Sequence, residues 1–186
     1  MLRDPPAFQP DPAVFAEVRW AQLPGDGLLP AEADALWRIY VEAMLAGYEP
    51  PRRDIEAFYF GDSPELAAKL AHLVVKGHKR ATSGWIEAME RSGETFPETG
   101  RVFAITDYFG YPLCVIETVE VRRVPFGEVA EDIATGEGEG DLTYADWREA
   151  HLDYFRREGE ALGIPFDDRS LVLNEVFRVL RVLGPR

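Results

Sequence analysis

The sequence predicts one α+β domain, a small and mainly antiparallel β-barrel with surrounding helices, preceded by an N-terminal helical extension. The chain has 186 residues, of which 46% are hydrophobic, and this suits one core better than two. Its expected strands are few, rarely alternate with helices and are separated by long connections, which favours α+β over a doubly wound sheet. The sequence has no phosphate loop, glycine-rich dinucleotide fingerprint or G-x-S-x-G elbow. We place the extension at residues 1–57 and the barrel domain at residues 58–186.

The extension begins with a proline-rich segment. Residues 1–30 are expected to form an extended arm, with a short helical turn near Val14–Arg19. A helix is predicted over residues 31–46, because its apolar residues recur at the 3.6-residue period. Residues 47–62 are expected to be a loop that includes a short strand at Phe58–Phe60.

A second helix has clear signals at both ends. Ser63 can cap the free backbone N–H groups, Pro64 suits the first helical position, and Gly77 suits a left-handed end. One or two helical turns are expected at Trp85–Glu90. Strands are then predicted at Arg101–Thr106 and, most clearly, at Leu113–Val124, with a turn at Gly110–Pro112 between them.

The last third of the chain is expected to hold a loop, a long helix and a central strand. Residues 128–142 are acidic and glycine-rich, which favours a loop with a short helix near Val129–Ala134. Thr143 or Asp141 then caps a helix that ends near Leu162. Leu171–Val182 is apolar on both faces in part, as in strands at the centre of a sheet.

The net charge of -13 limits the partners, because an acidic surface repels a nucleic-acid backbone. Duplex DNA is therefore not expected as a partner, whereas a small substrate or a short single-stranded RNA remains open. The single cysteine excludes an internal disulfide, and the three histidines lack metal-ligand spacing, so we expect no metal and no cofactor. Without a signal peptide or an apolar run of about 20 residues, a cytoplasmic protein without membrane contact is expected.

The stretch Gly77–Trp85 is the first candidate for chemistry, since it joins cations to two hydroxyls after a helix. A helix end accounts for the cations but not for the hydroxyls. Lys79 beside Thr82 suits nucleophilic or acid–base catalysis if the lysine is desolvated. In an extended strand the two side chains point to opposite faces, so they converge only if the chain bends there. Arg80 and Ser83 are candidate substrate-binding neighbours.

Carboxylates provide the other candidates. Glu117 lies in the apolar phase of the Leu113–Val124 strand, so it either faces a cavity or pairs with a cation, for example on the final strand. Glu137 and Glu139 lie between glycines, which allow close approach of the backbone to another element. The competing interpretation is an acidic surface loop.

The order of these pieces resembles the ASCH domain family over residues 58–183. The matching pieces are Phe60–Ala67, Gly77–Thr82, Val115–Thr118, Glu137–Asp141, Tyr144–His151 and Asn174–Val179. The resemblance implies a PUA-like fold, in which a small β-barrel and its helices surround a cleft. PUA-like domains commonly bind RNA, and some small ASCH proteins are amidohydrolases on acetylated cytidine or ribonucleases.

The resemblance also implies roles for individual residues. Lys79 and Thr82 match the amidohydrolase lysine and threonine, and Glu139 is the preferred third residue, with Glu137 as its rival. Thr82 would attack the amide carbonyl or position a water, Lys79 would take the proton, and Glu139 would pass it to the leaving amine. This chain departs from the pattern by its size and by Ala81 and Ser83 around the threonine.

Further side chains are candidate substrate ligands. Glu117 is expected to bond a base edge, and Trp85 to stack a base or fill the core. Arg148 and His151 lie one helical turn apart and either line the cleft or form a surface pair.

Three functions follow as hypotheses. A hydrolase for a modified nucleoside or nucleotide requires Lys79, Thr82 and Glu139 at one pocket. A non-catalytic RNA-binding module requires a continuous basic stripe, made of Lys76, Lys79, Arg80, Arg122 and Arg123. A ribonuclease would use the same cleft. A monomer or a homodimer suits each of them.

Overall fold

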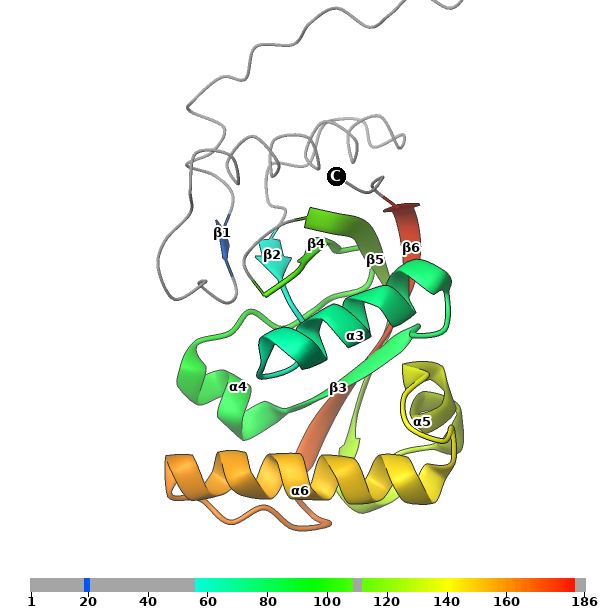
Figure 1. Ribbon diagram of the computed structural model, residues 1–186. Helices are drawn as coiled ribbons and strands as arrows, with labels where there is room; N and C mark the ends of the chain where they lie inside the picture. Colours follow the sequence, from blue (N-terminus) through cyan, green and yellow to red (C-terminus); the bar gives the residue numbers. More distant parts are fainter. Residues whose placement is uncertain (1–18, 21–55, 109–111, 183–186) are drawn as a thin grey trace, which may run out of the picture.

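The computed structural model describes residues 19–20, 56–108 and 112–182, and these form one curled mixed sheet with helices around it (Figure 1). The sheet order is β1-β2-β4-β5-β6-β3. The strands are β1 Arg19–Trp20, β2 Glu56–Phe58, β3 Ala81–Trp85, β4 Val102–Thr106, β5 Pro112–Pro125 and β6 Leu171–Val182. The helices are α3 Pro64–Lys76, α4 Ile86–Ser92, the 3-10 turn η1 Phe126–Glu128, α5 Glu131–Glu137 and α6 Tyr144–Leu162.

The sheet is antiparallel over most of its width, as predicted. β4, β5, β6 and β3 pair antiparallel in that order, whereas β2 pairs parallel with both β4 and β1. The prediction of an α+β fold is confirmed. β6 pairs with both β5 and β3, so the final strand lies inside the sheet, as its two apolar faces indicated.

Local signals set the ends of the two long helices. The Ser63 hydroxyl accepts a hydrogen bond from the backbone N–H of Leu66 at 3.3 Å, and Pro64 fills the first position of α3. The Thr143 hydroxyl accepts one from Asp146 at 3.1 Å, and α6 ends at Leu162 as predicted. None of the helices within the described ranges is both long and apolar enough to cross a membrane.

Two apolar clusters fill the space on either side of β3. One lies between α3 and the sheet and includes Phe60, Val74 and Phe177. The other lies between α6 and the far end of the sheet and includes Phe126 and Phe155. In Figure 1, α3 and α6 run above and below β3, with α4 and α5 near its two ends. The two ends of β3 contribute to the second cluster, since Ala81 and Trp85 are both members of it.

Two expectations about the described residues are wrong. The acidic segment 128–142 is more ordered than expected, because α5 extends to Glu137 and that side chain is buried. The apolar alternation of β5 breaks at Val119, where a register shift between Thr118 and Glu120 leaves Val119 41% exposed.

Other expectations concern the N-terminal extension and one turn. The helix over residues 31–46, nearly all of the arm and most of the turn at Gly110–Pro112 lie outside the described residues. Arg19, the last residue of the expected helical turn, belongs to β1 instead.

Candidate active site

The segment between α3 and β3 turns the Lys79 side chain into the protein. Helix α3 ends at Gly77, which has a left-handed φ of 87°. The backbone N–H groups of His78 and Lys79 then both donate to the carbonyl of Leu73, and that of Arg80 donates to Gly136 at 2.6 Å. These bonds fasten the bend to the helix on one side and to the acidic segment on the other. The chain therefore bends between α3 and β3, and this bend separates Lys79, which points away from the cavity, from Thr82, which lines it.

Lys79 is almost completely buried and lies between two carboxylates. Its ammonium is 2.9 Å from Glu137 Oε2 and 2.5 Å from Glu139 Oε1, and it lies over the Phe60 ring at 5.2 Å. Only 1% of the lysine is exposed. Burial alone would lower the pKa of Lys79, but the two carboxylates outweigh it and raise that pKa. Lys79 therefore carries a positive charge at neutral pH.

Glu137 is the centre of a buried polar network that the sequence did not indicate. One of its oxygens, Oε1, accepts hydrogen bonds from Ser83 Oγ at 2.7 Å and from Trp147 Nε1 at 2.9 Å. His151 Nε2 lies 3.4 Å from the same oxygen. Burial alone would raise the pKa of Glu137, but Lys79 and the other partners outweigh it and hold that pKa well below its usual range.

Gly138 is the reason that α5 can bring Glu137 so close to β3. The residue has a φ of 69°, and a Cβ there would overlap the backbone carbonyl of His78. A glycine is therefore required where the acidic segment touches the bend before β3. This contact satisfies the expectation of close backbone approach and removes the surface-loop interpretation of Glu137. Glu139, by contrast, is 28% exposed and forms the open end of the network.

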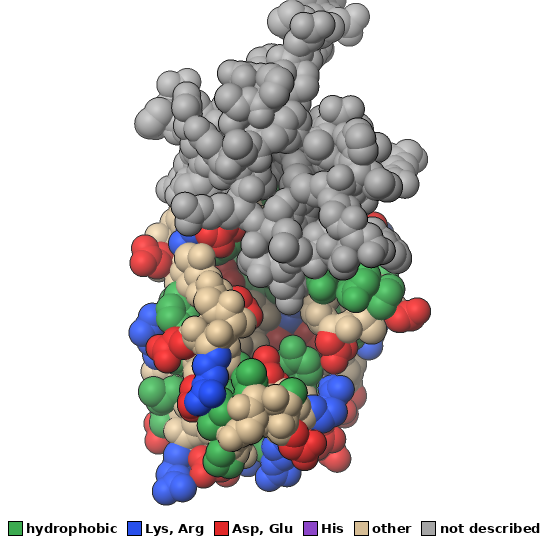
Figure 2. Space-filling view, turned by 90° about the vertical axis from the view of Figure 1, so that its left-hand side faces the viewer, with side chains coloured by type: hydrophobic (Ala, Val, Ile, Leu, Met, Phe, Trp, Pro, Cys, Tyr) green, Lys and Arg blue, Asp and Glu red, His purple; other side chains and the backbone are tan. Residues whose placement is uncertain are grey.

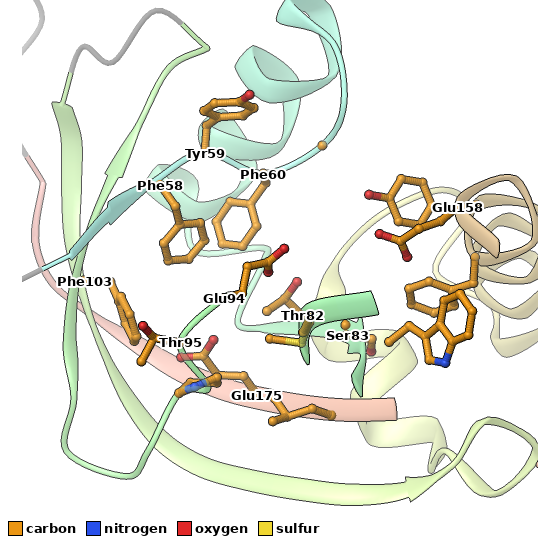
Figure 3. Close-up of a pocket in the computed structure, with 18 of the residues that line it drawn as sticks. Phe58, Tyr59, Phe60, Thr82, Ser83, Glu94, Thr95, Phe103, Glu158 and Glu175 are labelled. Carbon is orange, nitrogen blue, oxygen red and sulfur yellow. The ribbon is translucent and has the colours of Figure 1, made fainter. Parts of the chain in front are cut away.

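A cavity of about 230 Å³ lies beside this network, and Thr82 and Ser83 form part of its wall. Figure 3 shows Thr82 near its centre, with Phe58 and Phe60 on one side and Glu158 on the other. Ser83 joins the cavity to the network, since it donates to Glu137 and accepts from Asn174 Nδ2 at 2.8 Å. The Thr82 hydroxyl makes no side-chain hydrogen bond within the described residues, so it is available to a ligand.

Glu175 is a cavity residue that sequence reasoning missed. It is the direct register partner of Thr82 across the β3–β6 pair, and both side chains line the cavity. Thr118 Oγ1 donates to Glu175 Oε1 at 2.5 Å. Burial raises the pKa of Glu175 to about 7, although Thr118 and Lys79 act in the opposite direction. A carboxylate inside an apolar strand was the signal that singled out Glu117, and it applied equally to Glu175.

Most of the other residues that line the cavity are aromatic or acidic. Glu56, Glu94 and Glu158 line it together with Glu175, and none of the described lining residues is a lysine, arginine or histidine. Burial, with Glu94 nearby, raises the pKa of Glu158 to about 7. Within the described ranges, no cluster of three or more histidine, cysteine or acidic residues could hold a metal ion.

The structure separates the other predicted ligands into two groups. His151 joins the Glu137 network, and Trp85 lines the cavity while packing edge-on against Phe166 at 5.1 Å. Three residues lie elsewhere: Arg80 donates to the Val74 and Lys79 carbonyls, Glu117 pairs with Arg178 at 2.6 Å, and Arg148 pairs with Asp168 at 2.7 Å. Glu117 therefore pairs with a cation on the final strand and does not face the cavity.

Solved structures with the same architecture define the class of this protein as an ASCH domain fold. An ASCH domain from Lactobacillus crispatus superposes with a TM-score of 0.70 at 30% identity, over 85% of this chain and 99% of that one. Protein EF3133 from Enterococcus faecalis gives a TM-score of 0.66 at 27% identity, over 81% of this chain and 89% of that one. A search of curated proteins found no match.

The ASCH domain family model matches residues 56–181. This chain therefore belongs to the ASCH domain family, as the order of its sequence motifs predicted. The match begins within β2 and ends within β6, so it spans all of the elements that form the network and the cavity.

Proposed function

We propose that this protein is a hydrolase that removes an acyl group from the amine of a modified nucleoside. The observation that carries the proposal is the free Thr82 hydroxyl in an aromatic cavity, next to Ser83 and the charged network behind it. Glu139, Lys79 and Glu137 form an unbroken chain of contacts that ends at Ser83. Of the amidohydrolase pattern, Thr82 lines the cavity, whereas Lys79 and Glu139 lie in the network that reaches the cavity through Ser83.

The cavity lining supports a nucleoside as the ligand. Phe58, Phe60 and Phe103 offer rings on which a flat base can stack. Carboxylates accept hydrogen bonds from exocyclic amino groups, and four glutamates line the cavity. The same carboxylates repel phosphate, and no basic residue of the described lining offsets them. Within this proposal a nucleoside is therefore favoured over a nucleotide.

Long RNA is a weaker candidate, because the basic stripe does not form. Lys79 is buried, Arg80 is bound to backbone carbonyls, and Arg122 pairs with Glu120 and Asp132. On the face seen in Figure 2, basic side chains alternate with acidic ones. A ribonuclease would need a cleft that attracts the phosphate backbone, and the acidic cavity does the opposite.

The charge on Lys79 changes its role in the reaction. A lysine that is protonated and bound by two carboxylates has no lone pair with which to take a proton from Thr82. We assign it a positioning role, since its charge holds Glu137, which accepts a hydrogen bond from Ser83 on the cavity wall. Glu139 holds the lysine from the open side of the network.

The test is hydrolysis of cytidine acetylated on its exocyclic amine, followed by chromatography of released cytidine. Thr82→Val should lower kcat/KM by about 100-fold or more, because the nucleophile is lost while its shape is kept. Thr135→Val is the matched control, since that hydroxyl bonds only carbonyls of its own helix and should change the rate by less than about twofold. Undiminished activity in Thr82→Val, or no hydrolysis of any acylated nucleoside by the wild type, would refute the proposal.

A further inference from the structure

Thr82 needs a partner that can take its proton, and the structure limits the choice. Lys79 is charged, and Ser83 already donates to Glu137 and accepts from Asn174. Glu139 and Glu137 both lie against the lysine and do not line the cavity. The proton acceptor must therefore come from the cavity wall itself.

Among the carboxyl groups that line the cavity, Glu175 is the one that the sheet places directly opposite Thr82. The two residues are direct partners in the antiparallel β3–β6 ladder, where side chains share one face with Cβ atoms about 4.5–5.5 Å apart. Thr118 holds one carboxyl oxygen of Glu175. The other oxygen, Oε2, makes no hydrogen bond within the described residues and belongs to a residue that lines the cavity.

We infer that Glu175 is a catalytic residue that accepts the Thr82 proton and returns it to the leaving amine, a role that rests on the proposed hydrolase function. Glu175 as a carboxylate takes the hydroxyl proton while the Thr82 Oγ1–carbon bond forms. The resulting carboxylic acid protonates the nucleoside nitrogen as the carbon–nitrogen bond breaks. Water then attacks the Thr82 ester and gives a proton to Glu175. Glu175 passes this proton to Thr82 Oγ1 as the carbon–oxygen bond of the ester breaks, which releases the acid and restores the hydroxyl and the carboxylate.

The surroundings of Glu175 suit this exchange. Its pKa of about 7 allows both protonation states at neutral pH, which is the condition for efficient proton transfer. Lys79 and the Thr118 hydroxyl favour the carboxylate form, whereas burial favours the acid. The other titratable side chains that line the cavity are Glu56, Glu94, Glu158, Tyr59 and Tyr154. Glu56 is paired with Arg101 at 2.6 Å and so does not compete for the Thr82 proton.

The experiment separates this role from the choice of substrate. The full chain is treated with p-nitrophenyl acetate between pH 5 and pH 9, and acetylation of Thr82 is measured by peptide mass spectrometry. The wild type should acquire the label with an inflection near pH 7, and Glu175→Gln should acquire it about 100-fold more slowly without that inflection. Glu120→Gln is the control, because Glu120 is an exposed strand carboxylate outside the cavity.

Thr118→Val provides a second readout that a purely structural role would not produce. Loss of its hydrogen bond removes an interaction that lowers the pKa of Glu175, so the inflection should move to higher pH. An inflection that stays in place, labelling of Glu175→Gln within threefold of the wild type, or no label on wild-type Thr82 would each overturn the inference.

Hydrolysis of the acetylated cytidine distinguishes the two proposals. If Glu175→Gln hydrolyses it as fast as the wild type, the inference fails and the proposed function stands. If the wild type hydrolyses no acylated nucleoside, yet Thr82 is labelled in a Glu175-dependent way, the proton transfer stands and the nucleoside substrate fails.

Discussion

Replacing Lys79 with methionine should destabilise the fold strongly, because it leaves a buried carboxylate without its cation. The variant keeps the length of the side chain but leaves Glu137, whose side chain is 2% exposed, without its cation. Removal of one partner of a buried ion pair costs about 3–5 kcal/mol. Because Ser83 and Trp147 still donate to Glu137, we expect the lower end of that range, about 3 kcal/mol.

Urea unfolding at pH 7 measures this loss directly. With a slope of about 2 kcal/mol per molar urea, the midpoint should fall by about 1.5 M. Lys69→Met is the control, since Lys69 is exposed on α3 and its replacement should shift the midpoint by less than about 0.3 M. A midpoint for Lys79→Met as close to wild type as that of the control would refute the reasoning.

The stability that Lys79→Met loses depends on pH, and the lowered pKa of Glu137 sets the direction of that dependence. The folded pKa of Glu137 is lowered, so the stability from its pairing is present above the unfolded pKa of about 4.3 and is lost as the pH falls below it. In Lys79→Met the Glu137 carboxyl group can be protonated at a higher pH than in the wild type. The difference in the free energy of unfolding between the two proteins should therefore become smaller as the pH falls below neutral. The double variant Lys79→Met/Glu137→Gln removes both charges and should recover about 1.5 kcal/mol or more at pH 7.

Two further predictions concern the elements around the site. Gly138→Ala should lower the free energy of unfolding in urea by about 3 kcal/mol or more, because its Cβ would meet the His78 carbonyl. Gly93→Ala is the control, since Gly93 has a similar φ but open space around it, and should lower that free energy by only about 1 kcal/mol. Equal losses in the two variants would contradict the close contact. Glu175 has a folded pKa above its unfolded value, so its contribution to the free energy of unfolding is full below about pH 4.3. That contribution declines by about 3.5 kcal/mol as the pH rises through about 7. The thermal midpoint of Glu175→Gln should therefore fall less than that of the wild type between pH 5 and pH 8, and parallel curves would contradict the assignment.

Elements with local signals were predictable from the sequence. The capping serine and the first-position proline fixed the start of α3, and periodicity fixed β5 and β6 to within a residue or two. Such signals depend on neighbours a few residues away, and this is why they can be read without the fold. β3 was not predicted, because five residues with two glycine or serine positions carry little strand preference by themselves.

The residues of the candidate site also differ in how far local sequence signals predict them. Lys79 and Thr82 could be selected from their spacing and the family resemblance, and Lys79 bonds both of the acidic candidates, Glu137 and Glu139. The burial of Glu137 could not be predicted, because its acidic, glycine-rich surroundings are typical of a loop and its cation lies 58 residues away. Glu175 carried a usable signal, a carboxylate in an apolar strand, that was followed only at Glu117.

The position of β6 inside the sheet has a consequence for how the protein is made. Among the described strands, β3 pairs only with β6, and Ser83 meets Asn174 across 91 residues of chain. A nascent chain that has reached α6 therefore has no ladder partner for β3, and Lys79 has no closed interior to enter. Such distant pairing slows folding and leaves apolar surface open to chaperones until the last strand emerges. The sheet and the cavity are thus completed in a single late event, and a chain stalled before β6 has neither.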